Sequence, residues 1–325
     1  MSTYKNIVIG TPLTTLSDDI VRTGALIAES TGAAPWLVHA YSPVAYAAEI
    51  VDDRLLELQV ESVRHGLAQQ AHRTGLDALP GYKPAHLVHK IGSPYREIVA
   101  LARQVKADLI VLGATAGGVL HRAFLGSTAD AVIRKAPCPV LVVRSGAAFP
   151  PARVEIPVDL SPASASAFRQ GLELLNQIGV PLTETETLFV LHPIEIAASL
   201  QFSSEQRKRF AASELHRFME ENSHDPSLHR SSIRTGYPLE EILAALAERQ
   251  ADLVILGTHG RGGFERLTVG SVAAEVMHRS TCNLLVVPPE AAMRAEAVPA
   301  GEKEQKGADW DFVSDEDPVV ATARA

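Results

Sequence analysis

The stretch GTHGRGGFERLTVGSV, from Gly257 to Val272, has the residue types and spacing of an anion-binding loop. It follows the apolar run LVIL and precedes AAEVMHRS, whose pattern predicts a helix. Glycine lowers the stability of regular secondary structure by about 0.5–1 kcal/mol relative to alanine. Five glycines in one turn therefore indicate that the backbone must approach something that a Cβ would push away. The backbone N–H groups of such a turn can point one way, and the helix start adds about half a positive charge. Phosphate is the group that such a site usually binds.

Two interpretations of this loop remain open from composition. In the first, the loop binds phosphate, Ser271 adds a hydroxyl donor, and Arg261 and Arg266 bring positive charge. In the second, the glycines are turn residues of an exposed connection and Ser271 is the N-cap of the following helix. An isolated glycine pattern does not decide between them.

The sequence repeats itself at a constant offset of 144 residues. Pro94–Val143 aligns with Pro238–Val287 without a gap, which pairs the glycine loop with GATAGG, beginning at Gly113. The segment GAAFPPA, at 146–152, is the natural joint between the two halves. We therefore expect a first domain at residues 1–146, a second domain at 152–290 and a tail at 291–325.

Strands and helices alternate in the same predicted order in both halves. Several strands are continuous apolar runs, which is typical of a parallel sheet covered by helices on both faces. The predicted fold class is α/β, with two tandem, open, Rossmann-like parallel-sheet sandwich domains. Ligands of such sheets bind beyond the carboxyl ends of the strands, where the strand order reverses, and the glycine loop has that kind of position. The predicted strands include residues 5–10, 35–40, 153–158 and 187–192, and the predicted helices include 18–30, 163–178 and parts of 51–74 and 204–222.

The composition is that of a globular protein with a full core. Hydrophobic residues make up 46% of the 325 residues and charged residues 21%. No run approaches the roughly eighteen apolar residues of a membrane span, and the start MSTYKNIVIG lacks the features of a signal peptide. Two cysteines fit a reducing compartment, so we expect a cytoplasmic protein. The net charge of −8 disfavours nucleic acid as the main partner.

The tail at 291–325 differs from the rest of the chain in composition. It is rich in alanine, proline and acidic residues and has no periodicity, which predicts disorder. Trp310 and Phe312 within it are either a docking patch or part of a solvated tail.

The glycine spacing after the strand DLVILG resembles the signature of the universal stress proteins, and the resemblance covers nearly all of residues 1–290. It implies an open α/β sheet like that of the adenine nucleotide α-hydrolases and a stress-response or signalling role. It also implies bound ATP or AMP, with a divalent metal such as Mg²⁺ at the phosphates, and at most weak ATPase activity. Carried over residue by residue, the nucleotide site of the second half consists of Pro157, Asp159, Pro193, Gly257, Gly260, Arg261, Gly262, Gly270, Ser271 and Val272.

Departures from the signature are concentrated in the first half. Pro12 stands where the second half has Asp159, and Ala116 replaces the second loop glycine. In the second half, Pro193 has no N–H, which removes one main-chain contact to adenine. Asp159 itself has an alternative interpretation as a turn former. We expect the second half to bind nucleotide and the first half, which keeps Gly113, Gly126 and Ser127, to bind weakly or not at all.

Other candidate chemistry in the sequence is weaker. The histidines show no metal-ligand spacing, and no catalytic triad or Walker A sequence is present. Cys138 and Cys282 occupy matched positions where a small buried residue fits. Beyond a nucleotide-binding regulator, the alternatives are an interaction scaffold with a vestigial pocket and a slow ATPase. The resemblance also implies pairing of the two halves through their last strands and a possible homodimer.

Overall fold

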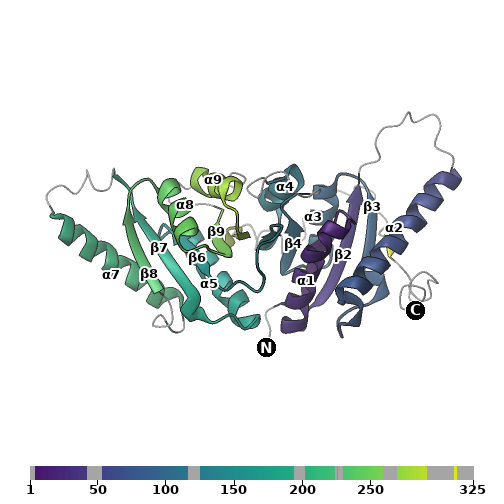
Figure 1. Cartoon of the computed structure of the whole chain (residues 1–325), viewed down its shortest axis with the longest axis horizontal. Coiled ribbons are helices and arrows are strands. Elements are labelled where there is room, and N and C mark those ends of the chain that lie inside the picture. Colours follow the sequence, from purple (N-terminus) through teal and green to yellow (C-terminus); the bar gives the residue numbers. More distant parts are fainter. Residues whose placement is uncertain are drawn as a thin grey trace, which may run out of the picture. The chain divides into compact units, whose positions relative to one another are not determined.

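The chain forms two compact units in a computed structural model that describes residues 4–41, 53–115, 125–193, 202–223, 225, 230–258, 269–290 and 311–312, without the side chains of 53–56 and 311–312. Unit 1 holds nearly all described residues up to Ser145 together with 311–312, and unit 2 holds those from Gly146 to Glu290. Within each unit, helices lie on both sides of a sheet of strands (Figure 1).

Unit 1 contains a sheet with the strand order β11-β3-β2-β1-β4-β5. Strands β1 to β5 are parallel, and β11 pairs antiparallel with β3. The strands are β1 (Asn6–Gly10), β2 (Ala34–Tyr41), β3 (Leu87–Ile91), β4 (Leu109–Gly113), β5 (Val140–Val143) and β11 (Asp311–Phe312). The α-helices are α1 (Asp18–Thr31), α2 (Asp53–Thr74), α3 (Pro94–Gln104) and α4 (Ser127–Lys135). Short 3₁₀ helices lie at Thr15–Ser17, Leu76–Ala78 and Pro84–His86.

Unit 2 repeats this arrangement with the strand order β10-β9-β6-β7-β8, all parallel. The strands are β6 (Val154–Val158), β7 (Thr185–Leu191), β8 (Arg230–Thr235), β9 (Leu253–Gly257) and β10 (Asn283–Val287), and the helices are α5 (Pro162–Gln177), α7 (Ser204–Asn222), α8 (Pro238–Glu248) and α9 (Ser271–Arg279), with a 3₁₀ helix at Leu182–Glu184.

The helices divide between the two faces of each sheet because the chain changes direction along the sheet. In unit 2 the chain moves outward from β6 to β7 and β8, and then returns to β9 on the other side of β6. Since crossovers between parallel strands are right-handed, the reversal moves the connecting helices to the opposite face. Accordingly α5 packs with α7, and α8 packs with α9; in unit 1, α1 packs with α2 and α3 with α4.

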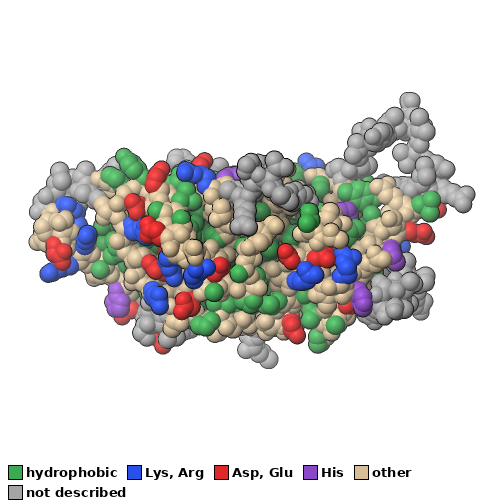
Figure 2. Space-filling model, viewed as in Figure 1, with side chains coloured by type: hydrophobic (Ala, Val, Ile, Leu, Met, Phe, Trp, Pro, Cys, Tyr) green, Lys and Arg blue, Asp and Glu red, His purple; other side chains and the backbone are tan. Residues whose placement is uncertain are grey.

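The predicted fold class is confirmed by this topology. The central strands are apolar runs whose side chains are buried on both faces, such as Ile7, Val8 and Ile9 of β1, which have no exposed surface, whereas the edge strand β8 is polar and partly exposed. Cys138 and Cys282 are buried as expected and form no disulfide. On the surface, Lys and Arg side chains alternate with Asp and Glu on the face shown in Figure 2.

The C-terminal segment contributes a strand that its composition does not predict. Within residues 291–325 the structure describes Asp311 and Phe312, and these pair with His89 and Val88 of β3. Strand β3 lies at the edge of the parallel sheet, where unpaired backbone groups favour the addition of another strand. The pairing therefore covers this edge of unit 1.

A charged cluster lies among the strands of unit 2 and has no counterpart in β1, where Val8 takes the place of Glu155. Glu155 in β6 has no exposed surface, and its Oε2 accepts a hydrogen bond from Arg249 Nη1 at 2.8 Å. Arg249 also contacts Glu186 of β7 at 3.2 Å through Nε. Burial raises the pKa of Glu155 to about 7. Arg249 lowers this pKa, and Glu186 raises it by a smaller amount than burial does.

Candidate functional site

The strand order of unit 2 reverses between β6 and β9, and this reversal defines the place where an open α/β sheet binds ligands. The two strands are paired at Val154–Leu253 and Glu155–Val254, which leaves Pro157 beyond the last pair. In unit 1, the corresponding pairing of β1 and β4 extends one residue further, to Ile9. Pro157 has no N–H to donate, which fits the earlier separation of β6 from β9. The paired segment of the two central strands is therefore one residue shorter in unit 2 than in unit 1.

The loop after β6 has a strained conformation and places Asp159 at the crevice. Leu160 has a positive φ of 61°, which is uncommon for a residue other than glycine. The Ser161 N–H donates to Asp159 Oδ1 at 3.0 Å, and the Ser161 hydroxyl caps α5 by accepting from the Ser164 N–H. Asp159 thus has the role of turn former that the sequence left as one alternative.

The two ends of the glycine loop are held together beside the crevice. The Gly270 N–H donates to the Thr258 carbonyl at 2.7 Å, and the Thr258 N–H donates to the Val287 carbonyl at 3.1 Å. Gly270 is the N-cap of α9, and Ser271 is the first helical residue rather than the cap. The loop residues Gly260, Arg261 and Gly262, together with His259 and Arg266, lie outside the described residues.

Glycine occurs at the two ends of the loop for different physical reasons. A Cβ added to Gly257 would lie 3.0 Å from the Ala163 carbonyl oxygen, so the close approach of α5 favours glycine there. A Cβ added to Gly270 would meet the Thr258 oxygen at 3.7 Å, which is ordinary van der Waals contact, and its φ of −58° suits any residue. Packing of the described residues therefore does not explain why position 270 is glycine.

The N-terminus of α9 lacks the acidic residue that would offset its positive charge. Its first turn contains no Asp or Glu, and no side chain caps it. Helix geometry leaves the N–H groups of Ser271, Val272 and Ala273 without intrahelical acceptors. Ser271 is exposed and Val272 is half-buried. This helix end has the geometry and polarity to receive an anion.

The corresponding place in unit 1 differs in two respects. The Gly126 N–H donates to the Ala114 carbonyl at 2.7 Å, as in unit 2, but an added Cβ at Gly126 would lie only 3.1 Å from that oxygen. The first turn of α4, which begins at Ser127, contains Asp130, whose carboxylate accepts two hydrogen bonds from Arg134. Unit 1 thus has an Asp–Arg ion pair in the first two turns of α4, at positions where α9 has Ala274 and His278. Gly113 ends β4, and Ala116 lies outside the described residues.

The ends of the second strands also differ between the units. In unit 1, His39 Nδ1 lies 2.8 Å from the Thr11 carbonyl oxygen, and its ring stacks on Tyr41. Burial lowers the pKa of His39, although the bond to Thr11 opposes this shift. In unit 2, Pro193 follows the end of β7, and His192 contacts Tyr237 edge to face. Pro193 therefore lies at the same end of the sheet as Asp159.

A buried polar network at the start of α1 was not apparent from the sequence. Gln70 of α2 has no exposed surface, and its amide nitrogen donates to Ser17 and Asp18 at 2.9 Å, while its oxygen accepts from Thr11. Arg73 adds two hydrogen bonds to Asp18 at 3.1 and 3.2 Å. These residues are far apart in sequence, and each has an ordinary pattern as a surface residue, so no local signal identifies the network.

No three His, Cys, Asp or Glu side chains gather into a metal site among the described residues. In the same part of the chain, no helix is both long enough and apolar enough to cross a membrane.

Comparison with known proteins identifies the family of the chain and supports the observed fold. The model of the Universal stress protein family matches the chain twice, at residues 3–144 and 152–288. The chain belongs to the universal stress protein family. A universal stress protein of Mycolicibacterium smegmatis is 28% identical over 293 residues, which cover 89% of this chain and 98% of that protein. One from Mycobacterium tuberculosis is 30% identical over 186 residues, covering 56% of this chain and 62% of its own length. A putative universal stress protein structure from Pseudomonas aeruginosa superposes with a TM-score of 0.66 at 15% identity, covering 90% of this chain and 96% of that one, and shares the fold.

Proposed function

We propose that this universal stress protein is a stress-related regulatory protein that binds ATP or AMP, mainly in unit 2, at the crevice between β6 and β9. The phosphates bind to the start of α9, through Gly270, Ser271 and Val272 and the loop residues Gly260, Arg261 and Gly262. Asp159 binds the ribose or the base, with Pro157 and Pro193 lining the nucleoside position and Gly257 allowing α5 to approach. Mg²⁺, where it takes part, is held through the phosphates.

One observation carries this proposal: α9 begins at a glycine that the packing does not require, with no acidic residue in its first turn. A bare helix N-terminus binds phosphate through its N–H groups and its positive charge. Gly270 leaves room for a ligand at the point where a Cβ would stand. Both features are missing at the corresponding position of unit 1, so we propose that unit 1 binds nucleotide weakly or not at all.

Hydrolysis is proposed to be slow or absent. The residues assigned to the phosphates are glycines, a serine, a valine and an arginine, and none of these is a general base at neutral pH. The protein then responds to the nucleotide by binding it rather than by turning it over. We place this activity in the cytoplasm, and the pairing of the two halves and the formation of a homodimer stay predictions of the sequence.

The substitution Ala274→Asp tests the phosphate assignment. Position 274 corresponds to Asp130 of unit 1, so the change gives α9 the acidic residue that α4 already has. Calorimetric titration with ATP and Mg²⁺ is expected to show about two- to fivefold weaker binding, because a carboxylate at the start of α9 then competes with the phosphates. Asp130→Ala is the matched control and should leave the unit 2 affinity unchanged.

Two further results complete this test. Gly270→Ala is expected to weaken nucleotide binding without lowering stability, since its Cβ meets protein atoms at ordinary distance. The wild-type protein is expected to bind with one strong site per chain. Full affinity in Ala274→Asp, or two equal sites in the wild type, would refute the proposed site. An absence of co-purified adenine nucleotide, with no thermal shift on adding ATP and Mg²⁺, would favour an interaction scaffold.

A further inference from the structure

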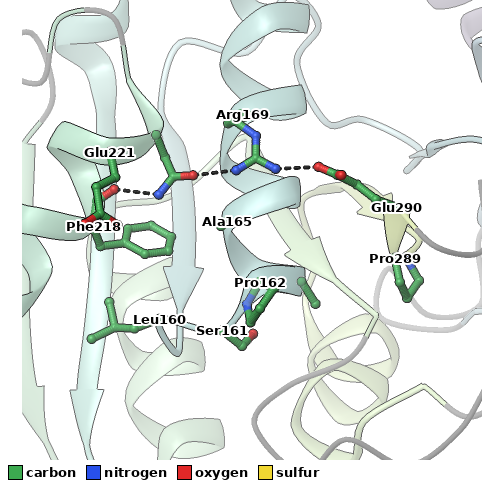
Figure 3. Close-up of a pocket in the computed structure, with 11 residues that line it drawn as sticks. Leu160, Ser161, Pro162, Ala165, Arg169, Phe218, Glu221, Pro289 and Glu290 are labelled. Carbon is green, nitrogen blue, oxygen red and sulfur yellow. Dashed lines mark hydrogen bonds and ion pairs between the residues drawn. The ribbon is translucent and has the colours of Figure 1, made fainter.

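Unit 2 contains a cavity of about 670 Å³ on the outer side of α5, between α7 and the residues that follow β10. Apolar residues on its inner side include Pro162, Ala163 and Ala165 of α5, and Leu160 and Ser161, which follow Asp159, also line it. The ring of Phe218, from α7, points into it beside Ala165 (Figure 3). Phe218 is 7% exposed and its ring contacts Phe168 edge to face, so this wall is fixed by the core. The volume is in the range of small-molecule sites.

Polar side chains line the mouth of the cavity and carry a surplus of negative charge. Arg169 donates hydrogen bonds to Asn222 on one side and to Glu290 on the other (Figure 3). Its charge is therefore offset by Glu290. Glu221 also lines the cavity and is 67% exposed, and its ion pair with Arg217 is long, at 4.0 Å. Among the residues that line the cavity, the one cation, Arg169, thus stands beside two carboxylates, while Arg217 lies outside the lining and bonds more closely to Glu214, at 2.6 Å.

At the corresponding place in unit 1, polar side chains of α1 and α2 are joined by hydrogen bonds. Residues 147 positions apart correspond in α1 and α5, as Arg22 and Arg169 illustrate. By this correspondence Ala165 stands where unit 1 has Asp18, which Arg73 and Gln70 of α2 reach with hydrogen bonds of 2.9–3.2 Å. In unit 2 a methyl group replaces that carboxylate, and the space between α5 and α7 stays open.

We propose that this cavity binds a small amphipathic amine, with its apolar body against Phe218 and Ala165 and its ammonium group at Glu221 and Glu290. An aromatic or aliphatic body fits the apolar inner surface, whose burial supplies the affinity. The surplus carboxylate charge selects a cation, and the ring of Phe218 adds a favourable face for it. The Arg169–Glu290 pair excludes anionic ligands while it is intact.

Three probes that share one body and differ in head group test the proposal: phenethylamine, 2-phenylethanol and phenylacetate. They are titrated into the full chain, and the amide resonances of residues 165 and 218 are followed by NMR. Phenethylamine is expected to bind with a Kd in the millimolar range, as befits a ligand of this size. The alcohol should bind at least about tenfold more weakly, and the acid should not bind. Equal binding of amine and acid, or no binding of any probe, would overturn the proposal.

Variants locate the probe in the cavity. Ala165→Leu fills the cavity and is expected to abolish the shifts, whereas Ala212→Leu, the same change at an exposed position of α7, should leave them intact. Glu290→Gln releases Arg169 and removes a carboxylate, so amine binding should fall and phenylacetate binding should rise. Amine binding that persists unchanged in Ala165→Leu, with a wild-type thermal unfolding curve, would show that the site lies elsewhere.

Discussion

The substitution Glu155→Gln is expected to change how the stability of unit 2 depends on pH. Glu155 has no exposed surface, and its Oε1 has no hydrogen-bond partner among the described residues. Its Oε2 is bound by Arg249 at 2.8 Å, but Arg249 is shared with Glu186. One guanidinium therefore serves two carboxylates, and the other charged group that acts on Glu155 is Arg234 of β8. Burial outweighs these partners and disfavours the charged form.

The magnitude follows from the shift in pKa. The pKa of Glu155 rises from 4.5 to about 7 in the folded protein. Because the folded state binds its proton more tightly than the unfolded state, stability is greatest below the unfolded pKa. It falls as the pH rises toward the folded pKa, and the loss is complete above it. At about 1.4 kcal/mol per pKa unit, ionisation of this group removes about 3 kcal/mol from unit 2 between about pH 5 and pH 8.

Hydrogen exchange read out by mass spectrometry separates the two units, because peptides from β6 and β7 report on unit 2 and those from β1 and β2 on unit 1. Wild-type unit 2 should lose protection between about pH 5 and pH 8, after correction for intrinsic exchange, and Glu155→Gln should lose about 3 kcal/mol less. Peptides of unit 1 and the exposed control Glu205→Gln should follow the wild type. An identical pH profile for wild type and Glu155→Gln would refute the reasoning.

Three further substitutions probe the packing of the two units. Arg249→Leu should destabilise unit 2 by about 3–5 kcal/mol near pH 8, because it leaves Glu155 buried without its cation, and by less near pH 5 in urea unfolding. Gly257→Ala should cost about 1–3 kcal/mol, since its Cβ would stand 3.0 Å from the Ala163 carbonyl oxygen; an unchanged urea midpoint would contradict this close approach. Gln70→Leu should cost unit 1 about 2–3 kcal/mol by leaving buried hydroxyl and carboxyl groups unpaired, and the Trp36 fluorescence transition should move while unit 2 peptides do not.

Most of the fold could be predicted from the sequence because its signals are local and occur twice. Apolar runs define the strands, and the helix expected at residues 18–30 is observed at Asp18–Thr31. The strand at Asp311–Phe312 could not be predicted, since two residues carry no periodicity and their partner β3 lies more than two hundred positions away. Pairing at such sequence separation depends on the open edge of the assembled sheet.

The candidate site was predictable only in part. The glycine spacing identifies both ends of the loop, but it does not show that α5 crowds Gly257 whereas Gly270 has room for a Cβ. That difference depends on the distance between the Gly257 backbone and the Ala163 carbonyl of α5, and the sequence does not show that these two segments lie close together. The cavity beside α5 is formed by three segments distant in sequence, and the substitution that opens it, Ala165 for Asp18, is unremarkable until the two units are compared.

The same substitution, of aspartate by alanine, distinguishes two helix starts of unit 2 from those of unit 1. Asp18 and Asp130 lie in the first turns of α1 and α4, and alanine stands at both corresponding positions of unit 2, Ala165 and Ala274. An acidic residue at a helix start contributes about 0.3–1 kcal/mol, so unit 2 forgoes this stabilisation twice. The loop backbone is shared, since Leu13 and Leu160 have the same positive φ, of 58° and 61°. The units therefore differ at these two helix starts in charge and side-chain volume, while the order of their parallel strands is the same.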